Sequence, residues 1–109
     1  MTTDHQIVLS TCPDAATART IATALVERGL AACVNIVPGV ESVYRWQGKL
    51  EHGSELLLLI KTRAECYAAL EQALLALHPY ELPEIIALPL AAGLPAYLGW
   101  IDANLKQES

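Results

Sequence analysis

The segment from Leu30 to Thr62, LAACVNIVPGVESVYRWQGKLEHGSELLLLIKT, predicts a long strand, a bend, a hairpin turn and a returning strand. Its last arm, residues 56–60, is apolar at every position. A strand with one face in water alternates apolar and polar residues, so this arm is expected to be buried on both faces. One layer of helices covers only one face of a sheet. We therefore expect a second partner to cover the other face.

Three irregularities are expected within this segment. Pro38 and Gly39 interrupt the first strand, but β character resumes at Val40, so the pair predicts a bulge or bend and not a strand end. Residues 47–49 (QGK) predict the hairpin turn. Residues 51–53 (EHG) predict a further irregularity before the run of leucines.

The rest of the chain predicts two more strands and three helices. Asp14 is a good N-cap for the first helix, and Gly29 is suited to follow its last turn. The order strand, helix, strand, strand, helix, strand and terminal helix predicts a ferredoxin-like (split βαβ) α+β fold in a single domain, 1–109. We expect residues 107–109 to fray. The expected strands cover residues 6–12 and 85–90, and the expected helices cover residues 15–28, 64–77 and 96–105.

Apolar stripes at helical spacing define the buried side of each expected helix. They comprise Ala18, Ile21, Ala22, Leu25 and Val26 in the first helix, Tyr67, Leu70, Leu74 and Leu77 in the second, and Tyr97, Leu98, Ile101 and Leu105 in the third.

The composition indicates an oligomer. Hydrophobic residues make up 53% of the chain and charged residues 17%, against about 45–50% and about 25% in an average soluble domain. The strands are apolar at successive positions, and a bare apolar face of several strands exceeds what soluble monomers usually expose. We expect an obligate homo-oligomer whose sheets pack around a closed axis.

Charge and hydropathy exclude several classes of protein. The net charge is −5, with seven Lys and Arg against twelve Asp and Glu, which disfavours binding to nucleic acid or to an anionic membrane. The start, MTTDHQ, lacks the features of a secretory signal, so we expect a cytosolic protein with three free thiols. The apolar run 85–101 is too interrupted for a membrane span, because Pro89, Gly93, Pro95 and Gly99 break it.

Six motifs occur in one order over nearly the whole chain. They are Thr11-x-Pro13-Asp14, LAACVN (30–35), Ser42-x-Tyr44-x-Trp46-x-Gly48-Lys49, Glu55 followed by IKT (60–62), His78-Pro79-Tyr80-x-x-Pro83-Glu84 and Tyr97-x-x-Trp100. Together they resemble the CutA family of divalent-cation tolerance proteins. The resemblance implies a ferredoxin-like subunit, a PII-like homotrimer in the cytosol, and a role in tolerance to copper and other divalent ions.

The sequence contains no short metal-binding motif and no Gly-rich phosphate loop, so a metal site would have to be assembled by the fold. The candidate ligands are Cys12 and His78. Cys12 lies at a strand end before a helix N-terminus, which would favour a thiolate suited to copper(I). The alternative interpretation of Cys12 is a small, half-buried structural residue. The alternative interpretation of His78 is a cap at a helix C-terminus. Copper sites suggested for the family correspond to Ser10, Leu77 and His78, of which only His78 is a ligand type. Cys12, two residues after Ser10 on the same strand side, is the expected substitute.

A second group of residues is expected at a cleft or subunit interface. Salt bridges between subunits are one interpretation, and a cleft for a small molecule or ion is the other. Three functions stay open: metal tolerance with bound copper or another divalent ion, PII-type small-molecule sensing, and a scaffold without chemistry. The sequence shows no pairing of a nucleophile with a general base, so we do not expect an enzyme. The group comprises Glu55 and Lys61 beside the leucine run, Tyr80, Glu81 and Glu84 in one loop, and Trp46 and Trp100 as aromatic anchors.

Overall fold

The computed structural model describes residues 3–106, so the expected fraying at residues 107–109 lies outside the described part. Four strands form one antiparallel sheet in the order β2-β3-β1-β4. This order confirms the predicted α+β fold of split βαβ type. Along the chain the elements are β1 (His5–Cys12), α1 (Ala15–Glu27), β2 (Cys33–Trp46), β3 (Lys49–Arg63), the short 3-10 helix η1 (Ala64–Cys66), α2 (Tyr67–Leu77), β4 (Ile86–Pro89) and α3 (Pro95–Ala103).

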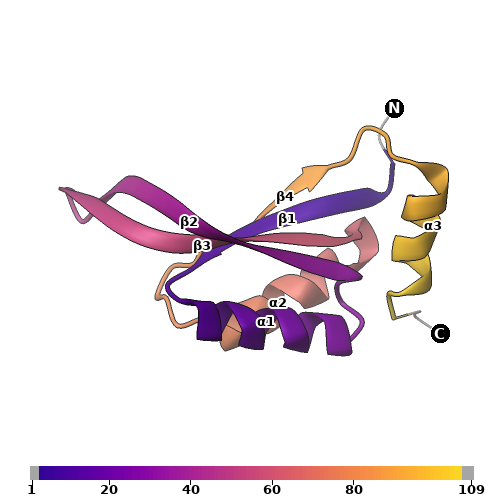
Figure 1. Cartoon of the computed structure of the whole chain (residues 1–109), viewed down its shortest axis with the longest axis horizontal. Helices are drawn as coiled ribbons and strands as arrows, with labels where there is room; N and C mark the ends of the chain where they lie inside the picture. The colour runs from indigo at the N-terminus through magenta and orange to yellow at the C-terminus, as the bar shows by residue number, and fades with distance from the viewer. Residues whose placement is uncertain (1–2, 107–109) are drawn as a thin grey trace.

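Helices α1 and α2 lie side by side against one face of the sheet (Figure 1). The core forms between these helices and the sheet. Val8 and Ile60 of the sheet and Ile21 and Leu70 of the helices are wholly buried there. Asp14 caps α1 as predicted, because its Oδ1 accepts a hydrogen bond of 2.8 Å from the Thr17 amide.

The opposite face, here called the open face, carries apolar residues of all four strands, with Asn35 and Lys61 as polar neighbours. Strand register places its side chains together, since Leu9 pairs with both Leu59 and Ile86. Ile86 and Leu88 are 49% and 48% exposed. The predicted bare apolar face is therefore confirmed within the single chain. The apolar residues of the open face are Ile7, Leu9, Val37, Leu57, Leu59, Ile86 and Leu88.

Strands β2 and β3 continue past the helices as a hairpin arm (residues 40–55), which projects from the body in Figure 1. The predicted bulge is confirmed, because the register shifts between Val37 and Val40 and Gly39 has a φ of 78°. The turn follows as expected, with positive φ at Gln47 and Gly48. The irregularity predicted at residues 51–53 is wrong, since all three residues pair regularly with β2. A glycine in a strand permits a bulge but does not require one.

Three helix predictions need correction. The second helix begins with the 3-10 turn η1, and α2 starts only at Tyr67. Val26 is 42% exposed, because α1 packs through Ala18, Ile21 and Leu25 and turns Val26 outward. Tyr97 is 40% exposed. Helix α3 does not face the main core. It lies at the end of the sheet, where Ile101 and Leu105 pack with Ala32.

A side chain at Gly29, two residues after the end of α1, is expected to destabilise the fold. The φ of Gly29 is +70°, and an added Cβ would lie 2.7 Å from the Cβ and 2.8 Å from the backbone nitrogen of Lys106. The same nitrogen donates a hydrogen bond of 2.8 Å to the Gly29 carbonyl. We expect Gly29→Ala to lower the free energy of unfolding by about 2 kcal/mol, from left-handed strain and the displaced contact together.

Gly39→Ala is the matched control for this prediction, measured by the same denaturant titration. Gly39 also has a positive φ, +78°, but nothing lies within 4 Å of its added Cβ. It should lose only the conformational part, about 1 kcal/mol. Equal losses in the two variants would show that the Lys106 contact is unimportant.

Among the described residues, none of the helices has the length and apolarity that crossing a bilayer requires.

Candidate functional site

The two predicted metal residues lie next to each other in the fold. Cys12 ends β1. His78 is the C-cap residue directly after α2, and its amide donates to the Leu74 carbonyl at 2.9 Å. The Cys12 Sγ is 4.0 Å from the His78 Nε2, and both residues are buried. Sixty-six positions of sequence separate them. The fold thus brings together a thiol and an imidazole that the sequence singled out separately.

Hydrogen bonds fix the proton on the imidazole. The amide of Tyr80 donates to His78 Nδ1 at 3.1 Å, so this nitrogen carries a lone pair. The other nitrogen, Nε2, lies 2.8 Å from the carbonyl oxygen of Thr11 and must donate to it. His78 is therefore held as the tautomer with its proton on Nε2, the nitrogen that faces Cys12.

The thiol is also protonated, contrary to the expectation of a favoured thiolate. Burial, followed by the negative charges of Asp14 and Glu55, raises the pKa of Cys12 to about 11. The sequence argument counted the positive end of α1 but not the Asp14 carboxylate that caps it. Without a metal, both groups of the pair carry protons at neutral pH.

A cleft of about 710 Å³ lies between the hairpin arm and the loop 80–84. Five residues of the expected cleft group line it: Trp46, Glu55, Tyr80, Glu81 and Glu84. Residues not singled out beforehand complete it: Thr11, Ser42, Val43, Tyr44, Leu82 and Pro83. The alternation of Ser42, Tyr44 and Trp46 on one side of β2 was the signal that could have identified two of them.

Glu55 is the half-buried carboxylate of this cleft. The Tyr80 hydroxyl donates to its Oε2 at 2.7 Å. Burial opposes ionisation, but hydrogen bonds from Ser42, Tyr80 and Thr11 outweigh it and lower the pKa of Glu55. Burial and then the Glu55 carboxylate raise the pKa of Tyr80, so its phenol remains a donor. Glu55 is thus a fixed negative charge.

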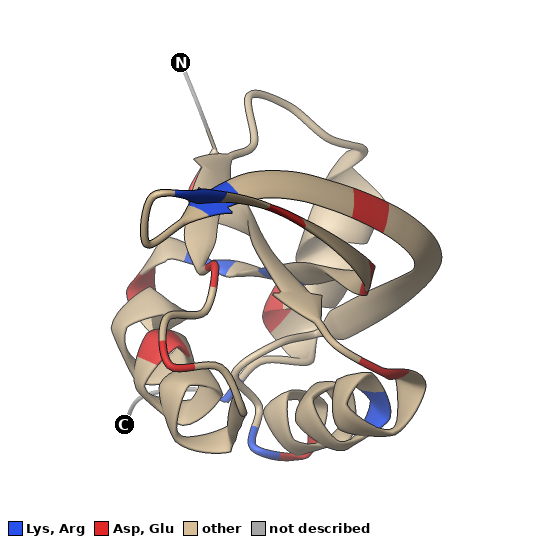
Figure 2. Cartoon of the chain, turned by 90° about the vertical axis from the view of Figure 1, so that its left-hand side faces the viewer, with Lys and Arg blue, Asp and Glu red and all other residues tan. Residues whose placement is uncertain are grey.

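Among residues 3–106, no lysine or arginine lines the cleft. The cations of the hairpin arm, Arg45 and Lys49, flank the turn at its tip, and acidic residues lie further back (Figure 2). The cleft also adjoins the metal candidates, since the rings of His78 and Tyr80 are 4.7 Å apart. Thr11 lines the cleft and also accepts a hydrogen bond from His78 through its carbonyl oxygen.

Lys61 and Trp100 do not belong to this cleft. The Lys61 ammonium donates to the Tyr97 hydroxyl at 3.3 Å and lies 5.6 Å from the centre of its ring. The Tyr97 and Trp100 rings stack at 5.6 Å. Tyr97 and Trp100 of α3 form a separate aromatic surface with Lys61 of β3, and the expected place of Lys61 and Trp100 in a subunit interface stays a prediction.

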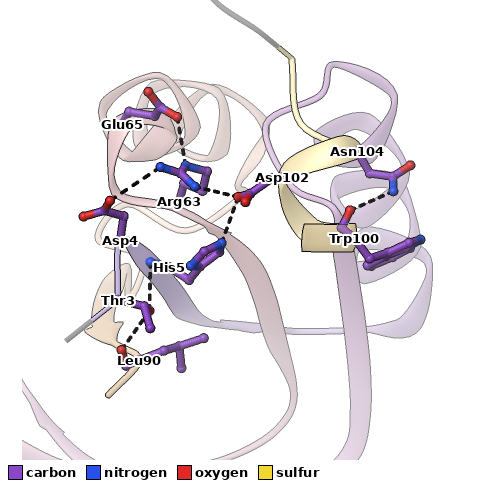
Figure 3. A network of polar contacts seen from close by, with 9 residues as sticks. All are labelled: Thr3, Asp4, His5, Arg63, Glu65, Leu90, Trp100, Asp102 and Asn104. Carbon is purple, nitrogen blue, oxygen red and sulfur yellow. Dashed lines mark hydrogen bonds and ion pairs between the residues drawn. The ribbon is translucent and has the colours of Figure 1, made fainter. Parts of the chain in front are cut away.

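Sequence reasoning missed a polar network that holds α3 against the sheet end (Figure 3). Asp102 Oδ1 accepts from Arg63 at 2.6 Å and from His5 Nε2 at 2.8 Å. Arg63 also contacts Glu65 at 2.9 Å and Asp4 at 3.6 Å. The buried Nδ1 of His5 has no hydrogen-bond partner in the described part of the chain.

Within residues 3–106, no group of three or more His, Cys, Asp or Glu side chains is arranged to hold a metal ion. An ion at Cys12 and His78 would thus have two protein ligands from this chain. A thiolate and an imidazole fit a soft ion such as copper(I) better than a hard one.

Comparisons with known proteins agree on one family. The model of the CutA1 divalent ion tolerance protein family matches residues 6–104. The chain is 54% identical over 100 residues to the divalent-cation tolerance protein CutA of Thermus thermophilus, covering 92% of this chain and 97% of that protein. The crystal structure of CutA from Xylella fastidiosa has a TM-score of 0.93 at 49% identity and covers 95% of this chain and 100% of its own. A similar structure from Archaeoglobus fulgidus, with a TM-score of 0.90 at 39% identity over 94% of this chain and 99% of that one, is described as a periplasmic divalent cation tolerance protein CutA.

Proposed function

This chain belongs to the CutA1 divalent ion tolerance family, and from that premise we propose that it binds copper or another thiophilic ion through Cys12 and His78. The observation that carries the proposal is the distance of 4.0 Å between the Cys12 Sγ and the His78 Nε2 in a buried setting. Sulfur and imidazole ligands select copper and zinc over magnesium and calcium. Asp14 and Glu55 add negative charge nearby, which favours a bound cation.

Binding at this pair must displace protons. The Cys12 thiol has to ionise, and its pKa of about 11 makes that unfavourable at neutral pH without a metal. The His78 proton must move from Nε2 to Nδ1, at the expense of the hydrogen bonds with Thr11 and Tyr80. The metal therefore competes with a proton, and affinity should increase with pH.

Copper(I) titration against a competing chelator tests the proposal. We expect one ion per chain and an affinity that rises about tenfold per pH unit between about pH 7 and pH 9, because one thiol proton is released well below its pKa. Cys12→Ser and His78→Gln should each weaken binding by at least about 100-fold. Glutamine is chosen because its amide can still donate to Thr11.

Cys66→Ser is the matched control, since Cys66 is a half-buried free thiol in η1, outside the pair. It should leave the affinity unchanged. Circular dichroism must show that the Cys12 and His78 variants remain folded. Unchanged affinity in both folded variants, or no dependence on pH, would remove the assignment.

We further propose a homotrimer closed by the open face. The support is the apolar surface that the open face presents across β3, β1 and β4, together with the exposed aromatic pair Tyr97 and Trp100. Isolated monomers rarely keep an apolar face of this extent in water. Sedimentation should give about three times the chain mass of 11.8 kDa.

We also propose a cytosolic, non-catalytic protein. The three cysteines are free, as in a reducing compartment. Cys12 and His78 resemble a catalytic dyad, but the imidazole proton points to the thiol side and to the Thr11 carbonyl, so His78 offers Cys12 no base. Fractionation of the source cells tests the location, and rapid alkylation of Cys12 at neutral pH would contradict the unreactive thiol.

PII-type small-molecule sensing is a second candidate, favoured by the cleft of about 710 Å³. Its three carboxylates and lack of lysine and arginine disfavour nucleotides, whose phosphates need positive charge. A rise in melting temperature with a ligand, and not with copper, would support this function.

A further inference from the structure

We propose that the cleft between the hairpin arm and the loop 80–84 binds an aliphatic diamine or polyamine. This inference deepens the small-molecule candidate above and rests on it, but not on the metal pair. It depends on three observations: the walls of the cleft, the sign of its charge, and the spacing of its carboxylates.

The walls suit an alkyl chain that carries positive charge. Tyr44, Trp46 and Tyr80 contribute aromatic rings, and Leu82 and Pro83 contribute apolar surface. The volume of about 710 Å³ lies within the range of roughly 300–1,000 Å³ for small-molecule sites. Aromatic faces attract ammonium groups, most strongly tryptophan. A neutral apolar molecule would gain nothing from this attraction between aromatic faces and positive charge.

The charge of the cleft has one sign. Glu55, Glu81 and Glu84 line it, and no lysine or arginine of the described part of the chain does. Glu55 is half-buried and held by hydroxyl groups, and it makes no ion pair among the described residues. A half-buried carboxylate without a cation attracts one from solution. The cleft therefore selects cations.

The spacing of the carboxylates distinguishes an organic cation from a metal ion. Within residues 3–106 no three acidic, histidine or cysteine side chains are arranged to hold one metal ion. Glu55 is half-buried, and Glu81 and Glu84 are exposed in the loop. In this arrangement the three carboxylates do not converge on one ion. A chain with ammonium groups separated by methylenes can contact several carboxylates and place its apolar parts on the rings.

Calorimetric titration of the purified oligomer with spermidine at about 0.15 M salt tests this inference. We expect one spermidine per cleft and no measurable binding of 1,8-octanediol, an uncharged chain of similar length. Magnesium at the same ionic strength should not displace the amine. The double variant Glu81→Gln and Glu84→Gln should weaken binding by at least about tenfold, since it removes two exposed charges and no buried contact.

The matched control is Glu41→Gln, which removes one exposed charge from the hairpin arm outside the cleft lining. It should change the affinity by less than about twofold. Trp46→Leu tests the aromatic contribution. It should weaken the binding of spermidine and leave the binding of copper(I) unchanged. Equal weakening by Glu41→Gln, displacement by magnesium, or no binding to the native protein would overturn the inference. Copper(I) binding by the double variant should stay normal. Its loss together with the amine would show that the two sites are one and would overturn the inference too.

Discussion

Replacement of Leu59 by glutamate is expected to turn the proposed trimer into monomers. Leu59 lies on the central strand β3 and pairs with Leu9 on one side and Asn35 on the other. It therefore lies in the middle of the open face. In an assembly closed through this face, the variant would bury an unpaired carboxylate in every subunit, which costs several kcal/mol for each chain.

The single chain should survive this change. Leu59 points away from the buried core face of β3, which carries Leu58 and Ile60. In a monomer, glutamate on the open face reaches water. The expected product is thus a folded monomer with reduced stability and not an aggregate of unfolded chains.

Sedimentation gives the result directly, because the mass should fall to that of one chain, 11.8 kDa. Leu75→Glu is the control, since Leu75 is 48% exposed on α2, on the other side of the sheet. It makes the same chemical change and should leave the oligomer intact. A trimer in Leu59→Glu, or a monomer in the native protein, would contradict the assignment of the open face.

The sequence predicted the sheet well because its signal is local. The apolar run 56–60 predicts a strand that is apolar on both faces, and the interruption at Pro38 and Gly39 predicts a bulge in the strand before it. The strand β3 and the bulge in β2 are both present. Exposure at Val26 and Tyr97 was predicted wrongly because it depends on how a helix docks. Helical periodicity identifies an apolar stripe but not the angle at which that stripe meets its neighbour.

The site was predictable in its residue types and less in its arrangement. Cys12 and His78 were chosen for their chemistry, and only the fold shows them 4.0 Å apart. The direction of the Cys12 pKa was predicted wrongly, since burial is a tertiary property. Glu55 and Lys61 flank the same leucine run, but six residues of extended strand separate them by about 20 Å. They therefore lie at opposite ends of one face of β3, Glu55 in the cleft and Lys61 beside Tyr97.

Removal of the Asp102 carboxylate is expected to be the most destabilising single change in the network beside α3. Asp102 accepts hydrogen bonds from Arg63 at 2.6 Å and from His5 at 2.8 Å. The buried Nδ1 of His5 already lacks a hydrogen-bond partner among the described residues. In Asp102→Ala the Nε2 of His5 would lose its bond to Asp102 as well. The Asp102 side chain is 40% exposed, so water screens part of these contacts. We expect a loss of about 2 kcal/mol in the free energy of unfolding, from the charged hydrogen bonds and the unsatisfied imidazole together.

The pH dependence identifies the charge of Asp102 as the cause. Hydrogen bonding to Arg63 outweighs burial, and with His5 it lowers the pKa of Asp102 from its ordinary value of 3.8. A carboxyl group with a lowered pKa stabilises the fold above that ordinary value, and the stabilisation is lost as the pH falls below it. The stability difference between native protein and Asp102→Asn should therefore be constant near neutral pH and shrink below about pH 4.

Denaturant titration at one fixed protein concentration measures these changes, because the stability of an oligomer depends on concentration. Asp102→Asn should lose about 1 kcal/mol, since its amide oxygen can still accept from His5 or Arg63. Asp4→Asn is the control. Asp4 has a side chain 83% exposed and lies 3.6 Å from Arg63, so its loss should be below about 0.5 kcal/mol. If Asp102→Ala were no more damaging than Asp4→Asn, the packing of Ile101 and Leu105 alone would hold α3, and the network would have no part in it.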